Sequence, residues 1–246
     1  MFEKQFQRYE YESRVDGLRD WYLFHEEAAQ DICVVVLHGH GSQGDQLITR
    51  PDIAGSWVPV LLKNKVSVIA PNLRGNAWMS EAAVSDLYEL LRNRQRSSSW
   101  RKTVIVSGSM GGTGALIFAM LHPELIGGVA ALGAATDIGR YLAWTGTQSH
   151  PVLCEIHDAI RTAYSDEESL RKHNVCAHAE QLTMPVCFYH GGGDKTIPVS
   201  EARALACALS GKKDFYYREI ENGVHDSPLV FFEDALMRLI HPEGER

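Results

Sequence analysis

Short apolar runs alternate with amphipathic stretches along most of the chain. The apolar runs lie at residues 32–37, 66–70, 103–106, 126–132 and 185–190, and a mixed run at 214–220 follows them. Continuous apolar runs are typical of strands that are buried on both faces of a sheet. Helical patterns occupy the stretches between or after them, at 53–64, 81–96, 115–121, 200–209 and 229–240. This alternation predicts an α/β fold with a mostly parallel sheet, buried strands and helices on both faces.

The amino-terminal segment has a different pattern. Aromatic and polar residues alternate at 5–11, a turn signal follows at 15–17, and a second aromatic run lies at 21–24. This pattern predicts an antiparallel hairpin at a sheet edge, which brings the number of predicted strands to eight.

Residues 136–184 interrupt the alternation. The stretches 137–144 and 151–164 have helical patterns, but no strand lies between them. A long excursion between two strands is usually a functional cap, although a helix that covers the sheet would also fit. We therefore expect one domain, 1–246, with 136–184 as a cap or lid insertion.

Charge and composition exclude several classes of function. The chain has 246 residues and a formal net charge of −7, which argues against nucleic-acid binding. We interpret Arg92, Arg94 and Arg96 as a solvated helix end. No apolar run is long enough to span a bilayer, and the charged amino terminus does not resemble a signal peptide. We therefore expect a cytoplasmic protein that does not bind membranes.

Cysteine usage supports a reducing compartment. Five cysteines cannot all pair, and Cys33, Cys187 and Cys207 lie within apolar strand or helix patterns. This placement favours buried, reduced thiols over a disulfide framework.

The segment 103–121 contains the strongest candidate for chemistry. A β-branched run ends in SGSMGG at 107–112, and a helical run follows with almost no loop. A serine at the apex of such a turn, here Ser109, is held clear of both elements at the positive end of a helix dipole. Taken alone, the motif leaves two alternatives open: a phosphate-binding or dinucleotide-binding turn, and a helix N-cap.

The loop after the first interior strand has the sequence HGHGSQG at 38–44. Its glycines favour a turn that presents backbone N–H groups to an anion. His38 and His40 also suggest a metal site, but the other ligands of a binuclear hydrolase motif are missing from 41–45. His173 and His178 have the wrong spacing for one helix face, so we interpret them as surface histidines. No metal and no cofactor are expected.

Two more polar loops follow strands that we expect to be buried, at 185–190 and 214–220; they are HGGGD at 190–194 and NGVH at 222–225. With HGHG at 38–41 and SGSMGG at 107–112, these motifs resemble those of the α/β-hydrolase superfamily, in which nucleophile, acid and base occur in the order Ser, Asp, His. The resemblance covers nearly the whole chain, with Ser107 in place of the usual glycine. It implies that Ser109 is the nucleophile, Asp194 the acid and His225 the base.

The same resemblance implies an oxyanion hole and leaves some assignments open. The donors would be the backbone N–H groups of Met110 and His40, with Gly41 as the fallback. Other candidates for the base are His38 and His190, both of which are better explained as turn formers. Asp137 is the competing acid, and Asp226 is interpreted as an N-cap.

These observations predict a serine hydrolase that cleaves carboxylic esters through an acyl-serine intermediate. The expected substrate is a small ester, held in an apolar pocket under the cap. The predicted pocket residues are Gly41, Trp78, Met79, Tyr141, Leu142 and Trp144. A peptidase or amidase of the prolyl-oligopeptidase type and a non-catalytic ligand receptor are the alternatives. Arg74 would meet an anionic substrate group or form a structural ion pair.

Overall fold

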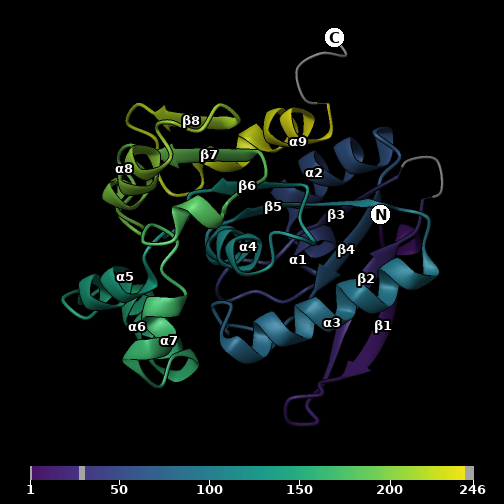
Figure 1. The fold of residues 1–246 in the computed structure, drawn as a ribbon, viewed down its shortest axis with the longest axis horizontal. Helices are drawn as coiled ribbons and strands as arrows, with labels where there is room; N and C mark the ends of the chain where they lie inside the picture. The colour runs from purple at the N-terminus through teal and green to yellow at the C-terminus, as the bar shows by residue number, and fades with distance from the viewer. Residues whose placement is uncertain (1, 28–30, 242–246) are drawn as a thin grey trace.

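One eight-stranded sheet runs through the described part of the chain, residues 2–27 and 31–241 of a computed structural model (Figure 1). The strands are β1 (Gln7–Glu12), β2 (Arg19–His25), β3 (Ile32–Val35), β4 (Ser67–Pro71), β5 (Lys102–Gly108), β6 (Gly128–Leu132), β7 (Val186–Gly191) and β8 (Phe215–Ile220). Their order across the sheet is β1-β2-β4-β3-β5-β6-β7-β8. β2 pairs antiparallel with β1 and β4, and the other neighbours are parallel. The predicted sheet and edge hairpin are confirmed.

Helices cover both faces because alternate strand residues point to opposite sides of the sheet. On β3, Cys33 and Val35 belong to one apolar core and Val34 to the other. The helices α3 (Glu81–Ser97), α4 (Met110–Leu121) and α8 (Val199–Ala208) pack on the first face, whereas α2 (Pro51–Lys63) and α9 (Phe232–Ile240) pack on the second. The short helix α1 (Gln46–Thr49) precedes α2. Within the described residues, no helix has the length and apolarity that crossing a bilayer requires.

The strand order places a crevice at the carboxyl ends of β3 and β5. From β3 the chain moves to β4 on one side, and it then returns to β5 on the other side. Loops that leave neighbouring strands in opposite directions open a ligand crevice between them. The loop after β3 carries His40 and the turn after β5 carries Ser109, so both lie at this point.

The segment between β6 and β7 contains α5 (Ile138–Thr145), α6 (Pro151–Ala163) and α7 (Glu167–Lys172). Figure 1 shows these helices together at the lower left, away from α2 and α9. They form a third apolar cluster, in which Tyr141, Ile156 and Tyr164 pack with Trp78 and Met110. The segment therefore packs against the residues that surround the turn at Ser109. Helix α7 was not predicted because its six residues include no buried one.

Three expectations about burial were wrong. β8 is half-exposed along its length, because it is an edge strand with one neighbour. His173 is only 1% exposed, and its ring lies edge-on to that of Tyr164. Cys207 is exposed on the outer side of α8, whereas Cys33 and Cys187 are buried as expected.

The last turn of α3 is not solvated at Arg94, contrary to the prediction. The guanidinium of Arg94 lies over the ring of Tyr9, 4.0 Å from the centroid, and donates a hydrogen bond to the hydroxyl of Tyr22. The last turn of α3 is thus packed against the aromatic hairpin, where cation–π contact compensates for the partial loss of water.

Candidate active site

The turn between β5 and α4 holds Ser109 in a strained conformation. Its φ is 55° and its ψ is −128°, and it directly precedes the first residue of α4. The turn is also tight, because a Cβ on Gly111 would overlap the carbonyl oxygen of Leu37. The N–H of Ser109 donates to the carbonyl oxygen of Leu132 on β6 (2.9 Å). These contacts keep the hydroxyl clear of the strand and the helix.

Ser109, His225 and Asp194 form a continuous chain of hydrogen bonds. Oγ of Ser109 lies 2.9 Å from Nε2 of His225, and Nδ1 of His225 lies 2.7 Å from Oδ2 of Asp194. With the imidazole proton on Nδ1, His225 donates to the carboxylate and accepts the hydroxyl proton. The three residues come from the loops after β5, β8 and β7, which the parallel sheet brings to one edge. This arrangement can transfer a proton from a hydroxyl to an imidazole.

The environment of Asp194 favours a carboxylate. Burial of its side chain opposes ionisation, but the hydrogen bond and charge of His225 and the N–H groups of Ile197 and Thr196 outweigh that effect. Oδ1 accepts from Thr196 (2.7 Å) and Ile197 (3.0 Å). The pKa of the carboxyl is therefore held below its usual value, and Asp194 faces His225 as an anion.

The competing residues have other partners. Both ring nitrogens of His38 lie against backbone carbonyl oxygens, at 2.8 and 2.9 Å. His190 is fully buried, and its Nε2 lies 2.9 Å from the carbonyl oxygen of Ile197. The side chain of Asp137 caps α5 by accepting from the N–H of Arg140. Nε2 of His190 also lies 3.5 Å from Oδ2 of Asp194, but neither His38 nor His190 is hydrogen-bonded to Ser109, whose partner is His225.

Asp226 does not cap a helix with its side chain. It is the N-cap residue of a 3₁₀ turn at Ser227–Phe231, but it makes no side-chain capping bond. Its carboxylate instead pairs with Arg50 across the molecule, at 3.1 Å. Asp226 therefore occupies the predicted N-cap position, but its carboxylate bonds Arg50 on another loop and not the backbone of the turn.

Two of the predicted oxyanion donors, the N–H groups of His40 and Met110, have no protein partner across the described chain and are free to bind an anion. By contrast, the N–H of Gly41 donates to Oδ1 of Asn76 at 2.8 Å. Of the three predicted donors, Gly41 is already occupied.

The predicted pocket residues separate into two groups. Trp78 and Met79 line a cavity of about 20 Å³ that reaches Met110 and Gly111. Tyr141 is fully buried, packs 5.6 Å from the ring of Trp78 and donates to the carbonyl oxygen of Thr196. The half-buried Trp144 stacks on Tyr141, and neither Leu142 nor Gly41 lines the cavity. The structure therefore brings only Trp78 and Met79 to this cavity.

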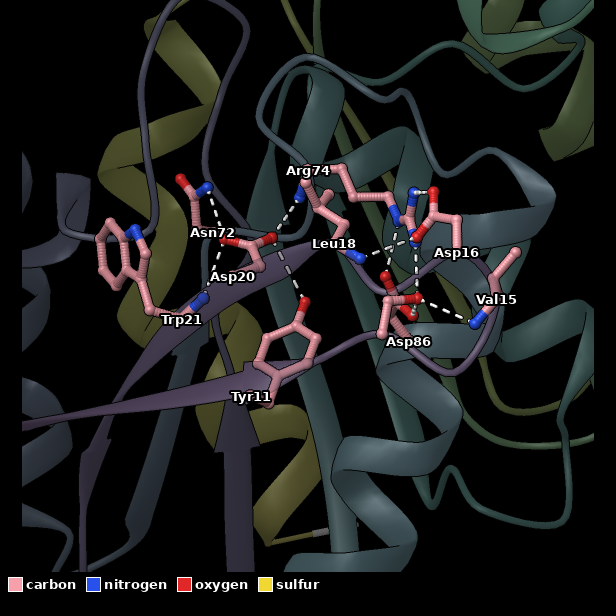
Figure 2. Close-up of polar contacts among 10 residues, drawn as sticks. Tyr11, Val15, Asp16, Leu18, Asp20, Trp21, Asn72, Arg74 and Asp86 are labelled. Atoms are coloured by element: carbon pink, nitrogen blue, oxygen red, sulfur yellow. Dashed lines mark hydrogen bonds and ion pairs between the residues drawn. The ribbon is translucent and has the colours of Figure 1, made fainter.

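Arg74 forms a structural ion pair (Figure 2). Its guanidinium bonds Asp86 at 2.6 Å and Asp16 at 2.8 Å. The hydrogen bond from Arg74 lowers the pKa of the Asp16 carboxyl to about 2. Because both ends of the guanidinium are paired, the alternative of an anionic substrate partner is not favoured.

Two residues that contact the site were missed in the sequence. The hydroxyl of the buried Tyr164 lies 2.8 Å from the carbonyl oxygen of Trp78 and 3.1 Å from that of Met79. Asn76 bonds the loop that carries His40. Neither contact has a local signal, because the partners are far apart in the sequence. Over the described ranges, no group of three or more His, Cys, Asp or Glu residues is arranged to hold a metal ion.

Comparison with known families agrees with this geometry. Residues 33–145 match the family model of the alpha/beta hydrolase fold. No curated protein sequence matches the chain.

Solved structures share the fold at low identity. The fluorophosphonate-binding serine hydrolase F of Staphylococcus aureus is 17% identical, with a TM-score of 0.70 and 96% of each chain covered. An S-formylglutathione hydrolase from Agrobacterium tumefaciens is 14% identical, with a TM-score of 0.73 and coverage of 96% of this chain and 95% of that one. A putative dipeptidyl aminopeptidase IV from Bacteroides ovatus is 15% identical, with a TM-score of 0.73, but only 36% of that chain is covered.

Proposed function

We propose that this chain is a serine hydrolase of the α/β-hydrolase superfamily, which cleaves carboxylic esters through an acyl-serine intermediate. The observation that carries the proposal is the hydrogen-bonded chain of Ser109, His225 and Asp194. The N–H groups of His40 and Met110, which have no protein acceptor among the described residues, support it. A serine hydroxyl is too weakly acidic to attack an acyl carbon unaided, and this arrangement supplies the base.

The geometry fits a two-step reaction. Oγ of Ser109 adds to the acyl carbon while its proton passes to Nε2 of His225, and the carbonyl oxygen becomes an oxyanion. Collapse of this intermediate breaks the ester bond, and the alcohol leaves with the proton from Nε2. Water then adds to the acyl-serine with His225 again as the base, releasing the acid and restoring the hydroxyl.

The remaining groups stabilise charge that develops along this path. The N–H groups of His40 and Met110 would donate to the oxyanion, and one such donor typically lowers the barrier by about 3–4 kcal/mol. Asp194 would hold the Nδ1 proton in place and stabilise the imidazolium. No metal or cofactor has a part in these steps.

The small cavity behind Met110 favours esters with short acyl groups. Trp78, Met79 and Leu73 line this cavity of about 20 Å³, and that volume holds about one water molecule or methyl group. We infer that residues 136–184 act as a cap, because Tyr141 and Tyr164 support Trp78 from this segment. The five free cysteines favour a reducing compartment, the cytoplasm.

A substrate series tests this proposal. We expect kcat/KM to be highest for p-nitrophenyl acetate and to fall for the butyrate and octanoate, because the cavity does not accept a longer chain. Aminoacyl p-nitroanilides should be hydrolysed far more slowly than the acetate. Faster cleavage of the anilides would indicate a peptidase, and folded protein that hydrolyses neither class would indicate a receptor.

Acidification is expected to lower kcat/KM. A protonated imidazole has no lone pair on Nε2, so it cannot accept the Ser109 proton. The pKa of the Asp194 carboxyl is held below its usual value, so that group should stay ionised over the same range and should not add to the acid limb. Initial rates with p-nitrophenyl acetate between about pH 5 and 8 measure this, and a flat profile would contradict His225 as the base.

A further inference from the structure

The loop at residues 38–44, here the oxyanion loop, is bonded at both ends to the loop at 72–79, here the support loop. Nε2 of His38 lies 2.9 Å from the carbonyl oxygen of Asn72. The N–H of Gly44 donates to Oδ1 of the same asparagine at 3.2 Å. A Cβ on Gly44 would overlap the Asn72 backbone, so the two loops are in direct contact.

Three more contacts hold the middle of the oxyanion loop, the first of which runs from the N–H of Gly39 to Oε1 of Gln46 at 2.7 Å. Oδ1 of Asn76 accepts from the N–H of Gly41 at 2.8 Å. The indole N–H of Trp78 donates to Nδ1 of His40 at 3.3 Å. His40 is therefore fixed through its own ring and through the peptide that follows it.

The support loop is itself held in a strained conformation. Leu73 and Arg74 have φ values of 48° and 65°, which non-glycine residues rarely adopt. Figure 2 shows the contacts that hold it: Oδ2 of the buried Asp20 accepts from the Arg74 N–H at 2.6 Å, and Oδ1 accepts from Nδ2 of Asn72 at 2.8 Å. The guanidinium of Arg74 is paired with Asp16 and Asp86. Because these contacts hold the support loop rigid, it can in turn fix the position of the oxyanion loop.

We propose that Asn76 is a positioning residue for ester hydrolysis, which aims the N–H of His40 at the oxyanion by holding the N–H of Gly41. This inference rests on the proposed function. The side-chain oxygen of Asn76 accepts from the N–H of Gly41, so this neighbouring amide is not free to bind the anion in place of His40. It also fixes the peptide plane next to His40, so the donor is in place before the reaction begins.

We expect the contact between Asn76 and Gly41 to stabilise the transition state and not the bound substrate. Negative charge appears on the substrate oxygen only when Ser109 adds to it, so a misaligned His40 N–H lowers kcat and changes KM little. Asn76 is exposed, and water can bond the N–H of Gly41 after truncation but cannot hold the loop. Loss of one such hydrogen bond corresponds to about a five- to tenfold change in rate.

The experiment compares Asn76→Ala with Asn93→Ala. Asn93 is exposed on α3, and its side chain makes no hydrogen bond within the described residues, so its removal controls for loss of a surface amide. We expect Asn76→Ala to lower kcat for p-nitrophenyl acetate about five- to tenfold, with KM unchanged. The affinity for an aryl boronic acid, which forms a tetrahedral adduct with Ser109, should fall by the same factor. Asn93→Ala should match the wild type in both measurements.

The acid limb of the pH profile separates positioning of the oxyanion loop from disturbance of the base. It should be the same in Asn76→Ala and wild type, because Asn76 does not contact His225. Four results with Asn76→Ala would each overturn the inference while leaving the proposed function intact. They are an unchanged kcat, a change in KM alone, an unchanged boronate affinity, and a shifted acid limb of the pH profile. Wild-type protein that neither hydrolyses esters nor binds the boronic acid would overturn both.

Discussion

Ser109→Ala is expected to reduce kcat for p-nitrophenyl acetate by a factor on the order of 10⁶. Without Oγ no acyl-enzyme can form. The activity that remains is direct attack of water on the ester, assisted only by His225 and the two N–H donors. Covalent labelling by a fluorophosphonate should also disappear, because the same oxygen is the atom that attacks phosphorus. Because the side chain is small and half-exposed, the folded structure should persist.

A matched serine variant makes this result specific. Ser210 is exposed after α8, far from the site in the sequence, and Ser210→Ala should be labelled and should turn over ester as the wild type does. Labelling or turnover that persists in Ser109→Ala would remove Ser109 from the nucleophile's role.

Asp194→Asn is expected to lower kcat by about 10⁴-fold with little change in KM. The N–H groups of Thr196 and Ile197 hold Oδ1, so the asparagine oxygen should remain there and its NH₂ group should face Nδ1 of His225. That NH₂ is a donor, which forces the imidazole proton onto Nε2. Nε2 then cannot accept the proton of Ser109.

Asp137→Asn is the control for this variant, and it also tests the competing acid. Asparagine caps helices as well as aspartate does, so the first turn of α5 should be preserved. Rates should stay at the wild-type level. If Asp137→Asn lost activity and Asp194→Asn did not, the acid would be Asp137.

The interior of the fold could be predicted from the sequence because its signals are local. A strand buried on both faces is apolar at every position, and the loops that follow β3, β5, β7 and β8 carry short glycine-containing motifs that can each be recognised in the sequence, and together they resemble one family. Ser109, Asp194 and His225 could therefore be named together before their distances were known. The parallel sheet then placed them at one edge.

The remaining features depend on contacts between distant segments. Asn76 contacts Gly41, and Tyr164 contacts Trp78, across separations that no periodicity encodes. The burial of His173 follows from its contact with Tyr164, not from its spacing. β8 was misjudged for a different reason, since an edge strand and an interior strand can carry similar aromatic residues.

The contacts of Tyr164 bear on how substrates reach Ser109. Its single hydroxyl spans the carbonyl oxygens of Trp78 and Met79, both at positive φ. Swinging α6 outwards would leave these acceptors unpaired, at a cost of about 1–3 kcal/mol for each one that stays buried. We therefore expect α5 to α7 to stay docked during turnover. Substrates would then be selected by the shape of a fixed entrance, and the release of product would not wait for a slow opening motion.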